Sequence, residues 1–187
     1  MFLRVIKAIV EEIKNLIEFF ICYFPESRIG RFLRLKYWNY KLNNKGGSFE
    51  FASRINRPEL FEVDDYFAMG RGVLLWGHLN TNVFIGKNVS ISHNSYLVTA
   101  NHSIDDIAIP ITNQGYDYKT INYNNKEYNI VIEDDVWIAA NCVILPGTHL
   151  GKGCVVSAGS IVSGIFKDYS VIMGNPARVL KTRKTNE

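Results

Sequence analysis

The stretch that decides the fold is residues 132–162, IEDDVWIAANCVILPGTHLGKGCVVSAGSIV. Every sixth residue is aliphatic, and the residue four places after each of these is mostly small. The aliphatic set is Ile132, Ile138, Ile144, Leu150, Val156 and Val162, and the second set is Val136, Cys142, Thr148, Cys154 and Ser160. A helix repeats near 3.6 residues and a strand near 2, so neither alone produces this period. A period of six is typical of hexapeptide repeats, in which each unit forms one short strand and its corner. The sequence therefore predicts an all-β fold, a left-handed parallel β-helix.

The same period occurs earlier in the chain. Its aliphatic positions are Val73, Leu79, Ile85, Ile91 and Leu97, with Val83, Val89 and Ser95 as the small partners. The phase continues weakly back to Ile55, Phe61 and Phe67, where the partner positions hold the charged residues Glu59, Asp65 and Arg71. We therefore expect the regular repeat from about Val73. Leu97 and Ile132 are not separated by a multiple of six, which predicts an insertion that leaves the solenoid between them.

These boundaries predict three segments: an N-terminal helical segment (residues 1–48), a β-helix (49–177) with an excursion loop (103–130), and a C-terminal tail (178–187). A chain of 187 residues is the length of one domain with an appendage. The formal net charge of +3 neither favours nor opposes a nucleic-acid partner. Three cysteines make no disulfide framework, so we expect reduced core residues and a cytoplasmic protein.

The N-terminal segment contains two expected helices. Residues 1–24 are amphipathic, with charges too frequent for a transmembrane span and no layout of a signal peptide. Residues 28–42 are basic and aromatic. One interpretation is that these helices pack on the solenoid or between subunits. The other is that they attach the protein peripherally to the anionic inner face of the membrane.

Four segments in residues 85–183 resemble the hexapeptide acyltransferases, and among them the maltose and galactoside O-acetyltransferases and polysaccharide O-acetyltransferases. They are IGKNVSISHNSYLVTANHS (85–103), IEDDVWIAANCVILPG (132–147), AGSIV (158–162) and GNPARV (174–179). The resemblance implies acetyl-CoA as acyl donor, direct transfer of the acetyl group, and a homotrimer with the donor in the groove between two solenoids. We expect no metal site, because no two of the four histidines have the close spacing of a ligand set, and no nucleic-acid partner.

Within this resemblance, His102 is the expected catalytic residue. An imidazole can take the proton of a hydroxyl near neutral pH, and His102 lies where the repeat gives way to the loop. Asp105 and Asp106 follow closely and could orient His102, bind sugar hydroxyls, or form a solvated turn. Trp137 borders the active-site cleft in the resemblance, and its alternative role is a corner side chain between subunits.

The donor side is also implied by the resemblance. The positions that match contacts to coenzyme A are Ala140, Ala158, Ser163, Arg178 and Lys181. The last two are basic and suit phosphate groups. A backbone N–H near Ala139 or Ala140 is the expected donor to the tetrahedral intermediate.

The acceptor side departs from the galactoside and maltose pattern. Trp76, Asn80 and Asn82 are the candidate contacts to a sugar ring and its hydroxyls, whereas His78, His93 and His149 are expected at corners or on the surface. We expect the sugar of a cell-surface polysaccharide precursor as acceptor. An antibiotic or other small molecule is the second interpretation. The third is a β-helical metal enzyme such as the carbonic anhydrases, which needs three converging histidines, or a non-catalytic scaffold.

Overall fold

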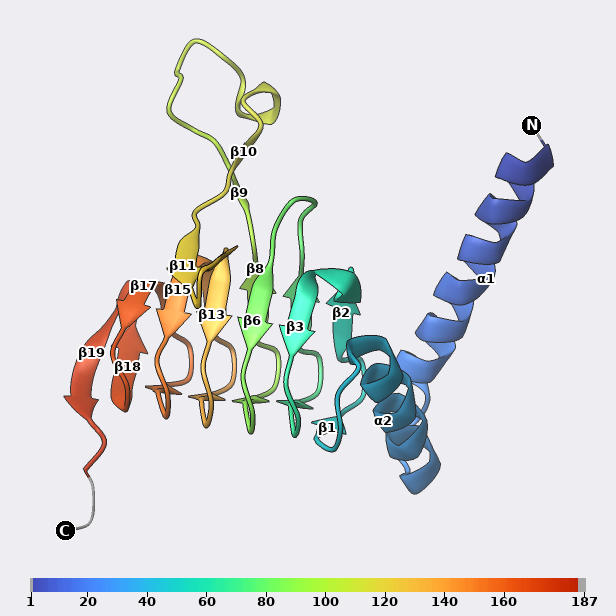
Figure 1. The fold of residues 1–187 in the computed structure, drawn as a ribbon, viewed down its shortest axis with the longest axis horizontal. Coiled ribbons are helices and arrows are strands. Elements are labelled where there is room, and N and C mark those ends of the chain that lie inside the picture. Colours follow the sequence, from blue (N-terminus) through green and yellow to red (C-terminus); the bar gives the residue numbers. More distant parts are fainter. Residues whose placement is uncertain (1, 185–187) are drawn as a thin grey trace.

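A computed structural model describes residues 2–184 of the chain. The main body is a β-helix whose turns stack along one axis, with two helices at its N-terminal end and an excursion rising from its middle (Figure 1). Strands of successive turns pair in parallel and form three walls, which we call walls A, B and C. The β-helix predicted from the six-residue period is confirmed.

The three walls have the following strands. Wall A contains β1 (Ser48–Phe49), β4 (Ala68–Met69), β7 (Ser90–Ile91), β14 (Trp137–Ile138), β16 (Val155–Val156) and β18 (Ser170–Gly174). Wall B contains β2 (Arg54–Asn56), β5 (Leu74–Trp76), β8 (Tyr96–Val98) and the first parts of β15 (Val143–Leu150) and β17 (Ile161–Phe166). Wall C contains β3 (Phe61–Val63), β6 (Val83–Ile85), β13 (Ile130–Ile132) and the second parts of β15 and β17. A 3-10 helix, η1 (Pro58–Leu60), precedes β3, and the last strand, β19 (Ala177–Thr182), pairs antiparallel with β18.

The predicted inward positions of residues 132–162 fill the interior. All of the aliphatic side chains and their small partners are at most 1% exposed. The hydroxyls of Thr148 and Ser160 donate to backbone carbonyls of their own corners at 2.7 Å, so no buried hydroxyl is left unpaired at these two positions. The residue before each small partner has a positive φ, which asparagine, aspartate and glycine adopt most easily. These corner residues include Asn88, Asn94, Asp135, Asn141, Gly147, Gly153 and Gly159.

In the first turns of the solenoid, the inward residues differ from the positions that the six-residue period predicted. Leu79 is exposed because residues 77–82 form a loop, and the inward residues on either side of that loop, Leu75 and Ile85, lie ten positions apart rather than six. In the turns before the loop, the second inward residue follows the first by two positions, as Met69 follows Phe67. The prediction placed each partner four residues after an aliphatic residue, which in these turns selects the charged residues Glu59, Asp65 and Arg71. The inward residues of one strand are instead two positions apart, and the regular solenoid already begins at β1.

The excursion leaves the solenoid at the corner between walls B and C. Its neck is a two-stranded ribbon of β9 (Asn101–His102) and β10 (Tyr116–Asp117), and a short 3-10 helix, η2 (Ile111–Asn113), lies in its tip. A hairpin of β11 (Ile121–Tyr123) and β12 (Lys126–Tyr128) leads back. The predicted boundary at residue 130 is one residue late, because Ile130 is already buried in β13 and pairs with Val83 of β6.

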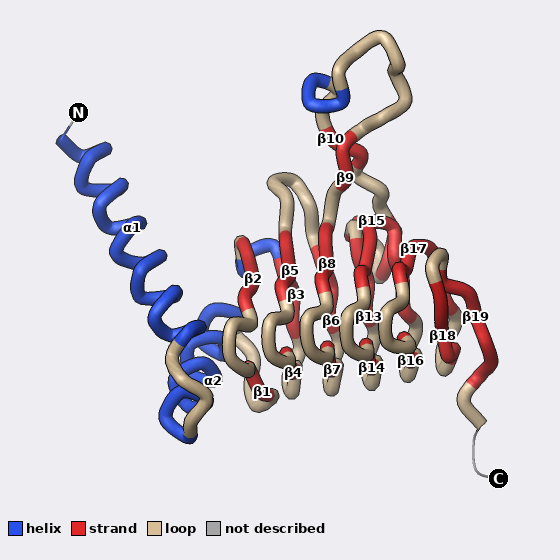
Figure 2. Tube along the Cα trace, turned by 180° about the vertical axis from the view of Figure 1, so that it is seen from behind, coloured by secondary structure: helices blue, strands red, loops and turns tan. Residues whose placement is uncertain are grey.

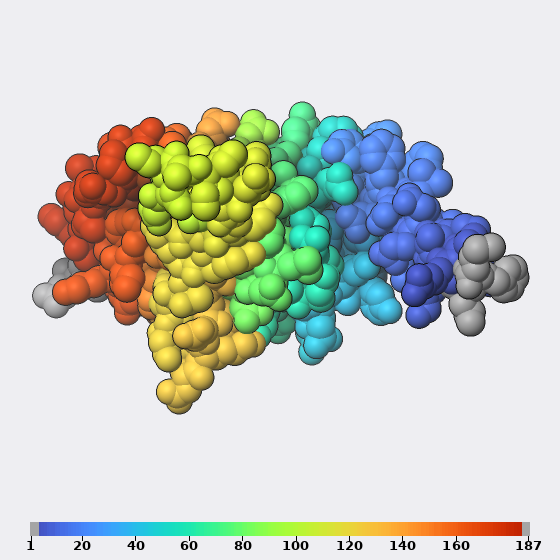
Figure 3. Space-filling view, turned by 90° about the horizontal axis from the view of Figure 1, so that it is seen from above, coloured from blue at the N-terminus to red at the C-terminus, as the bar shows by residue number. Residues whose placement is uncertain are grey.

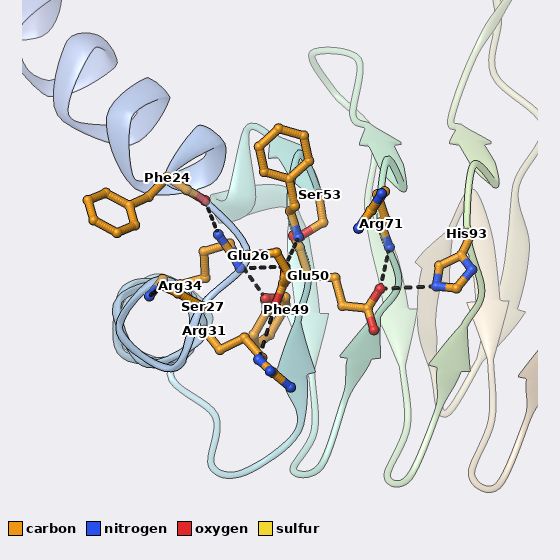
Figure 4. Close-up of polar contacts among 12 residues, drawn as sticks. Phe24, Glu26, Ser27, Arg31, Arg34, Phe49, Glu50, Ser53, Arg71 and His93 are labelled. Carbon is orange, nitrogen blue, oxygen red and sulfur yellow. Dashed lines mark hydrogen bonds and ion pairs between the residues drawn. The ribbon is translucent and has the colours of Figure 1, made fainter.

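Helix α2 (Arg28–Leu42) covers the N-terminal end of the solenoid (Figures 1 and 2). Ser27 caps it by accepting a hydrogen bond from the N–H of Gly30. Its buried residue Arg34 donates to the carbonyls of Phe24 and Phe49 and to the carboxylate of Glu26, at 2.7–2.9 Å (Figure 4). These contacts connect the turn between the two helices to the first strand of the solenoid.

Helix α1 (Phe2–Tyr23) projects away from the solenoid on the side on which the excursion rises (Figures 1 and 2). Most of its apolar side chains are about half exposed, including Ile9, Ile13, Leu16 and Phe20. The expectation that this helix packs on its own solenoid is therefore wrong for most of its length. Among residues 2–184, no helix is both long enough and apolar enough to cross a membrane.

Candidate active site

His102 lies in the neck of the excursion with its side chain exposed to solvent. It follows the buried residues Thr99 and Ala100, which continue from β8 of wall B. Tyr116 of β10 lies directly opposite His102 in the antiparallel ribbon. The imidazole is therefore carried on a short ribbon that starts from a rigid wall, and its ring nitrogens can reach a bound molecule.

Two aromatic residues of the excursion and a histidine of the 77–82 loop surround this position, and the sequence analysis missed all three. Tyr116 stacks on His102 with ring centroids 4.8 Å apart and ring planes 26° apart. The ring centroid of His78 is 4.0 Å from that of Tyr116, and the hydroxyl of Tyr118 is 3.0 Å from Nδ1 of His78. His78 lies at the corner between walls B and C, as expected, and its ring also contacts Tyr116 and Tyr118. The alternation of Tyr116 and Tyr118 after the loop tip is the one sequence signal that marked this ribbon.

The 77–82 loop is anchored by a buried pair of threonines. The N–H of His78 donates to the hydroxyl of Thr99 at 2.8 Å, and the hydroxyl of Thr81 donates to the carbonyl of His78 at 2.6 Å. The two threonine hydroxyls are 2.8 Å apart. Asn80 is exposed in this loop and has a positive φ. The loop therefore holds His78 by its backbone and presents Asn80 to solvent.

Asn82 lies at the base of the excursion, where it pairs with Asn129. The backbone N–H and carbonyl of Asn82 bond to the side chain and backbone of Asn129 at 2.9 and 2.8 Å. Asn129 is buried and also donates its amide to the carbonyl of Lys119 at 3.0 Å. These contacts close the base of the excursion and leave the side chain of Asn82 exposed.

Trp76 ends β5 and has 43% of its surface exposed. It lines a cleft of about 740 Å³ between α1, α2 and the first turns of the solenoid. Tyr37 and Glu18 also line this cleft, and the tyrosine hydroxyl donates to the glutamate at 2.5 Å. Burial and this acidic neighbour raise the pKa of Tyr37 above its usual range. Trp76 and the loop that carries Asn80 and Asn82 therefore lie at one edge of wall B.

Asp105 is exposed and follows the ribbon that carries His102 by three residues. Its neighbour Asp106 belongs to a local network with Gln114, whose amide donates to the carbonyl of Asp106 at 2.7 Å. In the described part of the chain, no hydrogen bond joins Asp105 or Asp106 to His102. The excursion stands over the solenoid when the molecule is viewed from above (Figure 3).

Trp137 lies on wall A, not at the neck. It is 51% exposed, and its indole N–H donates to the hydroxyl of Ser92 at 3.0 Å. The N–H of Ala139 already donates to the carbonyl of Val156 at 2.9 Å, so Ala139 is not free to stabilise an oxyanion. Between residues 2 and 184, no hydrogen bond takes up the N–H of Ala140.

The expected donor-binding residues lie on the later turns of the solenoid, at different corners. Ala140 and Ala158 are in consecutive corners between walls A and B, whereas Ser163 is at a corner between walls B and C. Arg178 and Lys181 are exposed on β19. His102 leaves from the corner between walls B and C, so one chain places its imidazole and the two alanines at opposite ends of wall B.

The remaining reactive side chains offer no second centre. Burial raises the pKa of the Cys142 and Cys154 thiols, and it raises the pKa of Cys22 to about 12, with Glu18 as a smaller cause. Buried protonated thiols are poor nucleophiles. On the solenoid surface, Nε2 of His149 is 2.7 Å from a carboxylate oxygen of Glu133, and Nε2 of His93 is 3.0 Å from a carboxylate oxygen of Glu50. Among the described residues, no three His, Cys, Asp or Glu side chains are placed to hold a metal ion.

Comparison with known proteins places this arrangement in a family. The family model for bacterial transferase hexapeptides (six repeats) matches residues 129–164. WbbJ of Escherichia coli K12, which carries the name of a lipopolysaccharide biosynthesis O-acetyl transferase, is 30% identical over 148 residues, which are 72% of each chain. Galactoside O-acetyltransferase of Lactococcus lactis is 33% identical over 108 residues, 58% of this chain and 46% of that protein.

A solved structure shows the same fold. A galactoside acetyltransferase in complex with coenzyme A superposes with a TM-score of 0.62 at 21% identity, and the match covers 90% of this chain and 78% of that one. The chain spans less than half the length of several curated relatives that it matches. The match to WbbJ nevertheless extends over 72% of each protein, and the hexapeptide family model matches residues 129–164. The chain therefore belongs to the hexapeptide-repeat transferase family.

Proposed function

We propose that the protein transfers the acetyl group of acetyl-CoA to a hydroxyl of a sugar, with His102 as the general base. One observation carries this proposal: the exposed imidazole of His102 is held in the neck of the excursion, on a chain that is 30–33% identical to named O-acetyltransferases over 58–72% of its length. No carboxylate is hydrogen-bonded to it among the described residues, which leaves its ring nitrogens available to a substrate hydroxyl.

The transfer is direct in this proposal. His102 removes the proton of the acceptor hydroxyl while the hydroxyl oxygen bonds to the thioester carbonyl carbon. The carbon–sulfur bond then breaks, and the imidazolium returns its proton to the departing thiolate. The buried, protonated cysteines argue against an acyl-enzyme on sulfur. The free N–H of Ala140 is the proposed donor to the oxyanion.

The site is completed by a second copy of the chain. His102 and the corner residues Ala140 and Ala158 lie at opposite ends of wall B within one chain, so a donor held by the alanines of one subunit would meet the imidazole of another. Wall B also has an apolar outer surface, which favours association. From β5 to β17 its outward residues include Leu74, Tyr96, Val98, Val143 and Ile161, whereas β2 presents Arg54 and Asn56. We propose a homotrimer, with Ser163, Arg178 and Lys181 along the same donor groove.

The acceptor is the sugar of a cell-surface polysaccharide precursor in this proposal. Trp76 offers an aromatic face in the cleft beside α1, and Asn80 and Asn82 offer exposed amides in the loop that follows β5. Trp137 and Asp105 lie elsewhere in one chain, and they would have to reach the acceptor from a neighbouring subunit or from a moved excursion. An antibiotic or other small molecule is the second acceptor class, because a chloramphenicol acetyltransferase of Klebsiella aerogenes is 39% identical over 62 residues.

The exposed apolar side of α1 supports a peripheral membrane contact, which would bring the site near lipid-linked acceptors. The three free cysteines agree with a location in the cytoplasm, at the inner face of that membrane.

Acceptor screening tests the proposed activity. Release of the CoA thiol is followed with acetyl-CoA and a panel of monosaccharides, oligosaccharides and amphenicol antibiotics, and NMR of the product locates the ester. We expect turnover with a sugar and an O-acetyl product. An N-acetylated product, or turnover with the antibiotic alone, would refute the sugar assignment. Multi-angle light scattering tests the trimer, and a fully active monomer would refute a site shared between subunits.

A further inference from the structure

The strongest unassigned feature is the row of three rings formed by His78, Tyr116 and His102. They come from different parts of the chain: the 77–82 loop, the returning strand of the neck and its outgoing strand. Tyr116 lies between the two histidines, with centroid distances of 4.0 Å to His78 and 4.8 Å to His102. Nothing in the chemistry of acetyl transfer requires His78 or Tyr116 to touch a substrate.

The backbone explains why His102 and Tyr116 meet. They are directly opposite residues of an antiparallel ribbon, so their Cβ atoms point to the same face at about 5 Å separation. The ribbon has only two residues in each strand, and its histidine is exposed. Without a partner, an exposed imidazole on such a short ribbon would sample several rotamers. The ring of Tyr116 removes that freedom on one face of the imidazole.

His78 packs against Tyr116 with ring centroids 4.0 Å apart, and its backbone is held by hydrogen bonds. Its backbone N–H and carbonyl are bonded to the buried hydroxyls of Thr99 and Thr81. The hydroxyl of Tyr118 is 3.0 Å from Nδ1 of His78. Tyr116 and Tyr118, two positions apart in the returning segment, therefore both contact the 77–82 loop. The loop therefore connects the rigid solenoid to the neck through the rings.

We infer that Tyr116 and His78 are positioning residues: they fix the orientation of the His102 imidazole by stacking, and the 77–82 loop exists in this chain to supply that support. The inference rests on the proposed role of His102 as general base. A general base must lie at the correct distance and angle from the proton that it removes, so a small displacement of the imidazole lowers the rate of the chemical step. Loss of the stack should therefore lower kcat more than it changes the KM for acetyl-CoA.

Four variants test the inference in the full-length protein. Tyr116→Ala removes the middle ring, and we expect kcat to fall about 10-fold with the KM for acetyl-CoA changed less than about twofold. Tyr116→Phe keeps the ring without the hydroxyl and should restore kcat to within about threefold of the original protein. His78→Ala lies outside the ribbon and should lower kcat by about threefold or more, whereas His78→Phe should recover most of this loss. Ile107→Ala, in the fully exposed tip of the same excursion, is the control for mutation of the loop itself.

A second readout does not depend on catalysis. The chain has four histidines, so the Hε1 resonance of His102 can be assigned in a spectrum of histidine-labelled protein by comparison with His102→Ala. Stacking on Tyr116 should shift this resonance upfield by ring current; Tyr116→Ala should abolish the shift and Tyr116→Phe should keep it. An unchanged resonance in Tyr116→Ala would overturn the stacking itself. A changed resonance with unchanged kcat would overturn the positioning role, and a protein inactive with every acceptor would instead refute the proposed function.

Discussion

Replacing Arg34 by methionine should destabilise the junction between helices and solenoid far more than replacing Arg31. Arg34 is fully buried and donates three hydrogen bonds, to Phe24, Glu26 and Phe49, whereas the side chain of Arg31 is 66% exposed and reaches only the other oxygen of the same glutamate at 3.1 Å. The pair Arg34→Met and Arg31→Met thus removes one buried and one exposed partner of a single carboxylate (Figure 4).

The magnitude follows from what remains after the change. Methionine refills much of the volume, but the carbonyls of Phe24 and Phe49 lose their side-chain donor, and the Glu26 carboxylate keeps only Arg31 and the N–H of Phe51 as partners. Removing one partner of a buried ion pair costs about 3–5 kcal/mol. Glu26 keeps 30% of its side chain exposed, so water replaces part of the loss, and we expect about 3 kcal/mol for Arg34→Met. The exposed pair of Arg31 should be worth about 0.5 kcal/mol or less.

Urea unfolding at fixed protein concentration, followed by circular dichroism, measures both variants. The expected result is a clearly lower midpoint for Arg34→Met and a midpoint for Arg31→Met close to that of the original protein. Equal midpoints for the two variants would show that the buried contacts of Arg34 do not hold the junction, and the reasoning from burial would be refuted.

Three further predictions concern other parts of the chain. Asn129→Ala removes the side-chain contacts that close the base of the excursion, so limited proteolysis should cut between residues 103 and 128 at least several-fold faster, while Asn122→Ala on the exposed side of β11 should not change the rate. The three cysteines should resist iodoacetamide at pH 8 in the folded protein and react in urea, because burial raises their pKa and keeps the thiols protonated; rapid alkylation of the folded protein would contradict their placement. Ile13→Asp in the exposed apolar side of α1 should reduce co-sedimentation with anionic liposomes, Ile107→Asp should not, and absence of binding by the original protein at low salt would remove the membrane contact.

The sequence predicted the solenoid because its interior repeats at a fixed period. The residues from Ile132 to Val162 and from Ile85 to Leu97 are inward where the period placed them. A further periodic signal was available in the asparagine, aspartate and glycine residues that precede the small partners, since these residue types favour the left-handed corners. Leu79 was misplaced because the loop around it is an irregular insertion. Val73 and Ile85 are both buried and are twelve residues apart, so the six-residue count passed through Leu79, although Val73 and Ile85 are not equivalent inward positions.

The site was predictable only in part, for a different reason. His102 is marked locally, by its position at the end of a repeat. Its contact with Tyr116 depends on the pairing of two strands across the excursion, and the contact of Tyr116 with His78 depends on a loop of the preceding turn. Neither contact leaves a local pattern. The orientation of α1 has the same cause, because an amphipathic helix shows a similar pattern whether it covers a solenoid, another subunit or a membrane.

The most direct test of the central claim is the turnover of His102→Ala. With the acceptor identified by screening, kcat should fall about 100-fold or more, while the KM for acetyl-CoA and the unfolding midpoint stay close to those of the original protein. His149→Ala, which removes a histidine paired with Glu133 on wall C, is the matched control and should retain full turnover. Turnover of His102→Ala within a few-fold of that control would contradict the assignment of His102 as the general base.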